Sequence, residues 1–341
     1  METAKAVVVY GATGHTGRFI VAELIERGFV PILSGRDAFR LEVLAKEWDG
    51  VEVRPATVDD PASLDRALEG AAAVINGAGP FAVTAGPVVE AAMRAGIPYV
   101  DVAAELEANA TMFADYAEAA RTAGVAVVPA MAFYGGLGDL LVTAAMGDWT
   151  SADEAHIAYG LTSWHPTPGT RTAGRVSHER RAGRRVRFRD GELQYHDDKP
   201  VQQDWDFPEP LGRRAVIAEF TMADVITVPS HLPVPEVRTY MTVEAAKDLA
   251  SEDTPEPVAV DNQGRSDQTF AVDVVVRAGD VERRITAHGQ DIYAITAPLV
   301  VEAVARILTG RTHATGVASA GKIFDAEDFL RSLSPALTIT S

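Results

Sequence analysis

The sequence predicts an α/β protein: a Rossmann-type, doubly wound parallel sheet followed by a second α+β domain on a mostly antiparallel sheet. Over the first 130 residues, short apolar runs alternate with helix-period segments, the signature of βαβ units. After Gly138, long alternating strands follow one another without crossover helices, which is typical of antiparallel pairing. We therefore expect a first domain over residues 1–135 and a second over 136–295, with the C-terminal helices of 296–341 packing back on the first.

Short apolar runs give six expected strands in the first domain, at 6–10, 30–34, 51–54, 72–76, 99–102 and 125–129. Helical periodicity gives the helices between them, at 15–27, 38–48, 61–68, 86–95 and 107–123. Gly28, Gly96 and Gly124 each follow one of these helices, where a left-handed cap favours Gly. The endings therefore agree with the periodicity.

In the second domain, period-two alternation gives strands at 156–164, 237–243, 270–276 and 282–288. Helices are expected at 296–308 and 325–333, and the acidic, Pro-rich stretch 248–257 is expected to be a surface loop. We find neither an internal repeat nor a low-complexity tract.

Composition narrows the partners and the compartment. The 341 residues carry 31 Lys and Arg against 48 Asp and Glu, a net charge of −17, which argues against nucleic acid because phosphate binding needs a basic surface. The absence of Cys excludes a disulfide scaffold, a thiolate nucleophile and Cys-based metal sites. The apolar run 6–10 is too short for a signal peptide, and the uncharged stretch 70–89 contains Gly and Pro, so we expect a cytoplasmic protein without membrane insertion.

A Gly-rich segment follows the first strand and opens the first helix, with the spacing GxxGxxG. In such a loop Gly11 permits the tight turn, Gly14 lets backbone N–H groups approach a pyrophosphate, and Gly17 lets helix and strand pack closely. The expected pyrophosphate-binding residues are Gly11, Thr13, Gly14, His15, Thr16 and Gly17. The first domain is therefore predicted to bind a dinucleotide, and the second to bind substrate or to mediate oligomerisation.

The end of the second strand predicts which dinucleotide is bound. NAD-preferring folds usually carry a carboxylate there, but this chain has Ser34, Gly35 and Arg36. Arg36 can bind a 2′-phosphate and Ser34 can add a hydroxyl. NADP(H) is thus favoured over NAD(H). The alternative is that Arg36 merely begins a solvated helix with Asp37 as its N-cap. Val58 and Asp59, after the third strand, are expected near the adenine.

Small residues end the fourth strand, where the nicotinamide half of the cofactor must pass. They are Asn76, Gly77, Ala78, Gly79 and Pro80, followed by Phe81. Phe81 either covers one face of the nicotinamide ring or plugs a gap between helices.

Four stretches together resemble the saccharopine dehydrogenase-like NAD(P)-binding oxidoreductase family, which includes bacterial trans-acting enoyl reductase-like members. They are 11–17, 76–81 with 86–90, 96–101 with Glu105, and 289–293 with 296–297. The turn 168–170 is similar to a Gly-Gly-Thr segment of that family, whereas Ala104 departs from the Gly often found before the acid. The resemblance implies the fold and a nicotinamide cofactor, but leaves the substrate open because the family is chemically broad.

Two familiar catalytic patterns fail. Tyr195 and Lys199 match the Tyr-xxx-Lys spacing of short-chain dehydrogenases but lie in a polar hairpin of the second domain. The run from His178 to Ala182 begins like a zinc-protease helix but lacks the second His. We therefore expect no catalytic metal.

What remains is hydride transfer from NADPH to an unsaturated carbon, with a proton from a side chain or water. Tyr134 and His165 are the candidate donors, His231 is a weaker loop candidate, and Arg171 could hold a substrate carboxylate. We predict an NADPH-dependent oxidoreductase acting on a C=N, C=C or C=O bond of a small or carrier-linked anionic substrate. The alternatives are a trans-acting enoyl reductase and a non-catalytic NADP(H)-binding sensor or scaffold.

Eight Arg crowd the segment between Arg171 and Arg189. One explanation is an exposed hairpin edge guarded by charge, or salt bridges to the acidic first domain. The other is an anion dock for a carboxylated, phosphorylated or carrier-linked substrate. A homodimer through the second domain is also expected.

Overall fold

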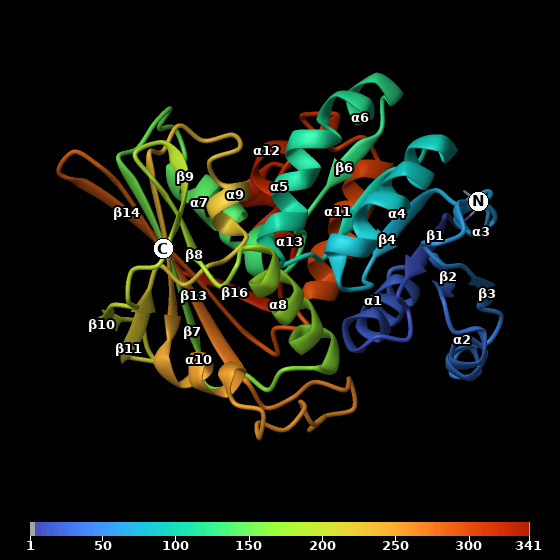
Figure 1. Cartoon of the computed structure of the whole chain (residues 1–341), viewed down its shortest axis with the longest axis horizontal. Coiled ribbons are helices and arrows are strands. Elements are labelled where there is room, and N and C mark those ends of the chain that lie inside the picture. Colours follow the sequence, from blue (N-terminus) through green and yellow to red (C-terminus); the bar gives the residue numbers. More distant parts are fainter. Residues whose placement is uncertain (1–3, 341) are drawn as a thin grey trace.

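The computed structural model describes residues 4–340, which contain two sheets lying side by side, with helix α8 (Pro168–Arg180) in front of the region between them (Figure 1). The first sheet has seven parallel strands in the order β15-β6-β5-β4-β1-β2-β3. Their bounds are β1 Ala6–Tyr10, β2 Val30–Gly35, β3 Glu52–Pro55, β4 Ala73–Asn76, β5 Tyr99–Asp101, β6 Ala126–Val128 and β15 Gly316–Val317. The strand order reverses between β1 and β4, the switch point beside which doubly wound sheets bind ligands.

The helices of this part are α1 (His15–Glu26), α2 (Ala38–Ala45), α3 (Pro61–Leu68), α4 (Phe81–Ala95), α5 (Leu106–Asp115), α6 (Ala117–Ala123) and α11 (Thr296–Leu308). Gly28, Gly96 and Gly124 have φ of +78°, +66° and +67°, so the predicted left-handed caps are confirmed. The helix expected at 107–123 is divided into α5 and α6, which meet at Tyr116.

Strand β1 forms the centre of the core. Val7 and Val9 pack on one side of the sheet in a cluster shared with Ile20 of α1. Val8 packs on the other side in a cluster shared with α3 and α4, which includes Leu64. Because both faces of a parallel sheet are covered by helices, every residue of its central strands can be apolar.

The second sheet is mixed but mostly antiparallel, in the order β10-β11-β12-β7-β13-β14-β16, with β8 and β9 attached beside β12. Only the pairing of β7 with β12 is parallel within this sheet of the described chain. Its strands are β7 Glu154–Leu161, β8 Arg185–Arg189, β9 Glu192–His196, β10 Gln202–Asp206, β11 Arg213–Ala218, β12 Glu236–Thr242, β13 Thr269–Ala278, β14 Val281–Gln290 and β16 Leu337–Thr340. The predicted fold class is confirmed.

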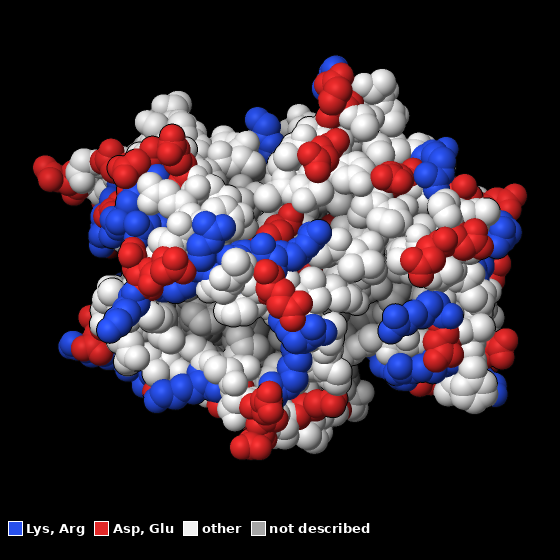
Figure 2. Space-filling view, viewed as in Figure 1, with Lys and Arg blue, Asp and Glu red and all other residues white. Residues whose placement is uncertain are grey.

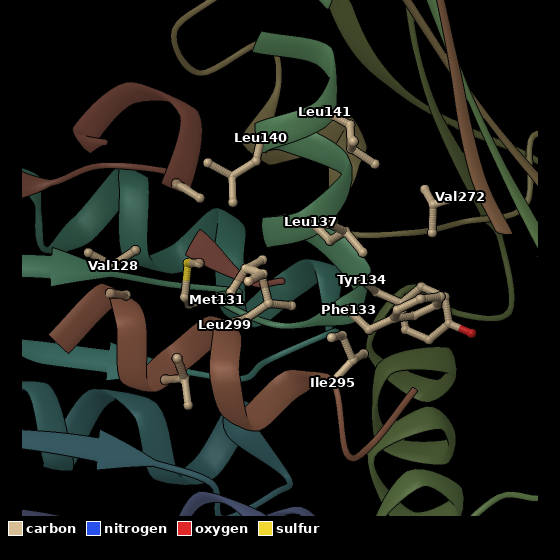
Figure 3. Close-up of a cluster of buried hydrophobic side chains, with 14 of the residues drawn as sticks. Val128, Met131, Phe133, Tyr134, Leu137, Leu140, Leu141, Val272, Ile295 and Leu299 are labelled. Atoms are coloured by element: carbon tan, nitrogen blue, oxygen red, sulfur yellow. The ribbon is translucent and has the colours of Figure 1, made fainter. Parts of the chain in front are cut away.

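A continuous apolar core joins the two sheets (Figure 3). It runs through the π-helical segment η1 (Phe133–Leu137) and helix α7 (Gly138–Met146). Figure 3 shows side chains from β6, α7, β13 and α11 converging on this segment. The remaining helices are α9 (Asp224–Thr227), α10 (Val243–Ala250), α12 (Ala320–Ile323) and α13 (Ala326–Ser332).

The C-terminal segment is shared between the sheets. Helix α11 packs on α1, as expected, but α12 and α13 pack against α7, and β16 pairs with β14 of the second sheet. The segment 296–340 therefore does not return to the first sheet as a whole, and residue 341 lies outside the described residues. No helix within residues 4–340 combines the length and the apolar character needed to cross a bilayer.

One expected turn is a helix. Residues 168–170 open α8, because Thr167 accepts a hydrogen bond from the Thr170 N–H at 3.1 Å and Pro168 occupies the first helical position. Three of the eight Arg of the Arg-rich segment therefore lie on α8 and five on or just before β8, rather than all on one exposed hairpin.

Candidate functional site

The loop after β1 brings the carboxyl ends of three strands together. Gly11 has φ +91°, and its N–H donates to the Ser34 carbonyl at 2.8 Å. A Cβ at Gly11 would lie 2.7 Å from the Ala78 nitrogen, closer than real Cβ contacts allow. Gly11 is therefore needed for the close approach of β1, β2 and the loop after β4.

The N-terminus of α1 is open to an anion. Gly14 is its N-cap, no side chain caps the helix, and its first turn holds no acidic residue. A Cβ at Gly17 would lie 2.3 Å from the Gly11 carbonyl oxygen, so the helix can start this close only with Gly there. Free N–H groups at such a helix start suit a pyrophosphate. Thr13 and Thr16 lie half-buried beside them.

His15, the first residue of α1, is wedged between aromatic rings. Its ring packs edge-on against Phe19 and Tyr293, with centroids 5.3 and 5.2 Å away. Burial, as the largest cause, lowers the pKa of His15, and its buried Nε2 has no hydrogen-bond partner among the described residues. We therefore expect the ring to be neutral, so that the backbone N–H groups rather than the imidazole would hold a phosphate.

At the adenosine end, Arg36 is exposed, and no residue within 4–340 forms an ion pair or hydrogen bond with its side chain. Asp37 caps α2 by accepting from the Arg40 N–H at 3.0 Å, so the N-cap of the alternative interpretation is present while Arg36 stays free. Sequence analysis missed two neighbours: exposed Arg40, and Phe39, which is 74% exposed. The spacing of Arg36 and Arg40, four residues apart, was the available signal.

Ser34 does not fit its predicted role. Its side chain is fully buried and its Oγ has no partner within the described chain, so the hydroxyl is not presented beside Arg36. Gly35 and Val58 are half-buried and Asp59 is exposed. Burial raises the pKa of Tyr10, Arg36 opposes that shift and Asp59 adds to it, which places both charges near this phenol.

At the nicotinamide end, Asn76 shapes the loop instead of presenting its amide. Its Nδ2 donates to Thr84 Oγ1 at 3.3 Å and to the Tyr99 hydroxyl at 3.1 Å, and its Oδ1 accepts from the Ala78 N–H at 3.0 Å. The side chain is fully buried. The accessible surface after β4 is therefore left to Gly77, Ala78, Gly79 and Pro80, which are half-buried or exposed.

Two buried carboxyl groups that were not predicted as site residues hold this end. Glu105 accepts from the N–H groups of Phe81 and Ala82 at 2.7 and 3.0 Å, which explains why α4 begins at Phe81 rather than at 86. Asp101 accepts from the N–H groups of Ala103 and Ala130, and burial raises its pKa to about 6. Both act on backbone geometry rather than on a ligand.

Helix α8 lies over the same end. A Cβ at Gly79 would contact the Phe81 ring at 3.6 Å and the Ala173 Cβ of α8 at 3.8 Å. Phe81 is 7% exposed and belongs to the core on the α4 side of the sheet. Of the two roles considered for Phe81, the structure favours the plug between helices.

Tyr134 is the better enclosed of the two candidate proton donors. Its ring packs against Tyr159 and Trp164 with centroids 4.9 and 5.1 Å away. Its hydroxyl is buried, without a partner among residues 4–340, and burial raises its pKa well above the usual value. In this conformation the hydroxyl is screened from solvent.

His165 and Arg171 are placed differently from each other. His165 lines an open cavity of about 420 Å³, together with Thr162, Ser163, Asp267 and Thr269. Arg171 donates from Nη2 to the Thr254 carbonyl at 2.8 Å, so its guanidinium is already engaged.

Two further buried groups occupy the interior between the sheets. His231, the weaker loop candidate, has its Nε2 2.8 Å from Oδ1 of buried Asp139 and is a structural group. Asp224 accepts from the Tyr159 hydroxyl at 2.9 and 3.0 Å, and burial raises its pKa to about 7. No cluster of three or more metal-ligating side chains occurs in the described residues.

Most of the Arg-rich segment is engaged within the protein. Arg187 pairs with Asp198 and Glu219 at 3.0 and 3.4 Å, and Arg185 donates to backbone carbonyls of 218 and 219. Further pairs are Arg175 with Glu179, Arg181 with Glu107, and Arg189 with Glu219 and Glu236. Within this segment, only Arg180 and Arg184 are exposed and have no acidic partner among the described residues. Acidic and basic side chains are intermixed on this face (Figure 2), which supports salt bridging over a dock. Among the partners only Glu107 lies in the first domain, so the salt bridges expected to that domain form mostly within the second.

Comparison with known proteins shows which family the first domain resembles. Residues 7–128 match the family model described as the saccharopine dehydrogenase NADP binding domain. A probable mitochondrial saccharopine dehydrogenase-like oxidoreductase of Arabidopsis thaliana is 31% identical over 148 residues, 39% of this chain and 32% of the relative. A lipid droplet localized protein of Caenorhabditis elegans is 34% identical over 136 residues, 36% of this chain and 32% of the relative. The match thus spans about a third of each relative's length.

Among solved structures, the saccharopine dehydrogenase (L-Glu forming) of Saccharomyces cerevisiae aligns with a TM-score of 0.65 over 99% of this chain and 100% of that chain. The sequence identity is 12%, so the likeness concerns the fold. It covers both sheets, whereas the family model covers β1 to β6 and the helices between them.

Proposed function

This chain belongs to the saccharopine dehydrogenase-like family, and on that premise we propose that it is an oxidoreductase that binds NADP(H) along the carboxyl edge of its first sheet. One observation carries the proposal: the uncapped N-terminus of α1 lies next to an exposed Arg36 that has no acidic partner within residues 4–340. Together they would provide two anion sites, one for a pyrophosphate and one for a 2′-phosphate.

The preference for NADP(H) over NAD(H) follows from the same corner. An NAD-preferring site would present a carboxylate to the ribose 2′-hydroxyl, whereas β2 ends here in Ser34, Gly35 and Arg36. Arg36 with Arg40 would hold a 2′-phosphate, and exposed Phe39 would be able to stack on the adenine. The loop 11–17 would hold the pyrophosphate, and residues 77–80 would line the nicotinamide half.

The proposed reaction is hydride transfer to a C=N, C=C or C=O bond of a small or carrier-linked anionic substrate. When bound, the cofactor supplies the hydride. The cavity lined by His165 is the proposed substrate entrance, and His165, being half-exposed, is better placed than enclosed Tyr134 to deliver a proton. Reduction of an enoyl thioester by a trans-acting reductase is the finer alternative within this class.

A non-catalytic NADP(H) sensor is the alternative from another class, and two observations favour it. The Tyr134 hydroxyl is enclosed, and the Arg171 guanidinium is bound to the Thr254 carbonyl. A sensor would need the groove but no proton donor beside it.

Turnover separates the two. The purified chain would be mixed with NADPH and panels of imines, enoyl thioesters and keto acids, and absorbance at 340 nm followed. The oxidoreductase proposal expects consumption of NADPH with one panel and its loss in His165→Ala. Tight NADPH binding without consumption in any panel would contradict the enzyme and support the sensor.

Two further proposals come from the sequence alone. They are a cytoplasmic location and a homodimer through the second sheet. The printed names of two relatives mention mitochondria and lipid droplets, so location is best tested directly by imaging the tagged protein. Sedimentation velocity would test the dimer.

A further inference from the structure

Tyr293 connects the two sides of the groove. It lies in the loop between β14 and α11, in the segment 289–293 that carries part of the family resemblance. Its ring packs edge-on against His15 of the pyrophosphate loop, with centroids 5.2 Å apart. Its hydroxyl points the other way, into the turn between β7 and α8.

Four groups of that turn surround the Tyr293 hydroxyl. The Thr170 Oγ1 lies 3.0 Å away, and the Trp164 Nε1 and the Thr167 N–H each donate at 3.3 Å. The hydroxyl is also 3.3 Å from the His165 carbonyl, to which it can donate. We call residues 164–170 the turn; they comprise the end of the β7–α8 connection and the first three residues of α8. It carries the candidate proton donor and precedes Arg171, so this single phenol holds the segment from which substrate-facing residues start.

The turn in turn sets the start of α8. Thr167 caps the helix, and Ala173 lies above Gly79 at the nicotinamide end of the groove. One turn further along, Ser177 Oγ donates to Glu107 of α5 at 2.6 Å. A shift of the turn would therefore move the helix that covers the nicotinamide half.

The base of Tyr293 is fixed. Asp291 is fully buried, and its two carboxylate oxygens accept from the N–H groups of Tyr293 at 2.9 Å and Ser266 at 2.7 Å. Because its backbone is fixed, the Tyr293 ring cannot move with His15 without also displacing the turn residues that bind its hydroxyl. Movement of His15 when a pyrophosphate binds would consequently reach the turn through the phenol ring.

We propose that Tyr293 is a positioning residue that couples pyrophosphate binding at the loop 11–17 to ordering of the turn 164–170. The inference rests on the proposed function, because it takes a dinucleotide as the ligand of the loop. Dinucleotide binding restrains the turn beyond the hold that Tyr293 already gives it, so substrate binds more tightly once the cofactor is present. Because such coupling is reciprocal, a ligand that orders the turn also tightens NADPH binding.

Hydrogen exchange measured by mass spectrometry tests the coupling without a known substrate. NADPH should slow exchange of the amides of 165–173 by about fivefold or more in the wild type, the lower limit for a typical coupling. Tyr293→Phe keeps the ring but loses the hydroxyl, and should reduce this slowing to less than about twofold, with NADPH affinity within about fivefold of the wild type. Thr170→Val should do the same from the turn side.

Tyr116→Phe is the matched control, because its hydroxyl binds Glu90 at 3.0 Å outside the groove and its loss should leave the slowing intact. Thermal melting would establish that each variant is folded. If Tyr293→Phe does not fold, the comparison is made with Thr170→Val instead. Equal slowing in wild type and in both variants would overturn the inference, as would NADPH binding that leaves the turn unchanged. Failure of wild-type protein to bind NADPH is a separate outcome, which overturns the proposed function itself.

Discussion

The two ends of the candidate dinucleotide groove are built on opposite principles. At the adenosine end, Arg36, Arg40 and Asp59 are exposed, and the two Arg have no acidic partner within residues 4–340. At the nicotinamide end, Asn76 and Glu105 are buried, and each already binds backbone or side-chain groups of the protein.

This difference indicates that the adenosine end determines cofactor specificity, whereas the nicotinamide end determines the backbone conformation of the site. An exposed charge without a partner costs the fold little to change, so the adenosine end can select a cofactor without affecting stability. A buried carboxylate that caps a helix cannot be removed without leaving N–H groups unpaired. We therefore expect substitutions at the adenosine end to change affinity, and those at the nicotinamide end to change stability.

Gly14→Val should have the largest effect, because it acts where both ends meet. A branched side chain at the N-cap of α1 would stand between the N–H groups and the pyrophosphate and crowd the Gly11 carbonyl oxygen, 3.2 Å from an ideal Cβ. We expect NADPH affinity to fall by about 100-fold or more, worth about 2.7 kcal/mol. Calorimetry measures the affinity and circular dichroism the fold. Gly174→Ala, whose Cβ meets nothing within 4 Å, is the control.

Glu105→Ala should destabilise the fold at the nicotinamide end. It leaves the N–H groups of Phe81 and Ala82 unpaired at the start of α4 and should lower the free energy of unfolding by about 2–3 kcal/mol. Glu118→Ala removes an exposed carboxylate paired with Arg121 and should cost less than about 0.5 kcal/mol. Urea unfolding measures both. Equal losses in the two variants would mean that Glu105 is not a buried cap.

Buried Asp224 should make the free energy of unfolding depend on pH, which the exposed charges of the adenosine end should not. Burial raises its pKa to about 7 from 3.8, so the folded protein holds a proton that the unfolded chain releases. Its stabilising contribution is therefore complete below about pH 4 and is lost as pH rises through about 7, by up to about 4 kcal/mol. Asp224→Asn cannot titrate, so its stability should fall less than that of the wild type between pH 5 and pH 8. If the melting temperatures of the wild type and of Asp224→Asn change equally with pH across this range, Asp224 does not have the raised pKa.

The smallest effects are expected at the exposed Arg of the second domain. Arg180→Gln with Arg184→Gln should leave the melting temperature within about 1 °C, since neither side chain has an acidic partner in the described chain. Arg185→Gln loses donors to the backbone carbonyls of 218 and 219 and should melt several degrees lower. A raised KM and a flatter salt dependence in the exposed pair would restore the anion dock; unchanged values would leave these Arg without a substrate role.

Much of the first sheet was predictable because its signals are local. The apolar runs, the Gly caps and the GxxGxxG loop lie in single short segments, and Asp37 follows the second strand directly. Residues 168–170 were harder, since Pro-Gly-Thr is typical of a turn but becomes a helix start once Thr167 caps it.

The missed features depend on distant residues. Glu105 acts on N–H groups 23 and 24 residues earlier, and Arg187 meets Glu219, 32 residues later. Ser34 illustrates another limit: Ile32 and Leu33 are both buried because helices cover both faces of the parallel sheet, so alternation does not reveal where the hydroxyl points. The tie from Tyr293 to His15 likewise joins residues that only the folded chain brings together.

If Arg36, which has no acidic partner within residues 4–340, selects NADP(H) at the edge of the first sheet, dissociation constants for the two cofactors will show it. NADPH and NADH would be titrated calorimetrically into the wild type and into Arg36→Asp, with Arg66→Asp on the surface of α3 as the control. We expect the wild type and the control to bind NADPH at least about tenfold more tightly than NADH, and Arg36→Asp to reverse or abolish that preference. Unchanged NADPH affinity in Arg36→Asp would contradict the account.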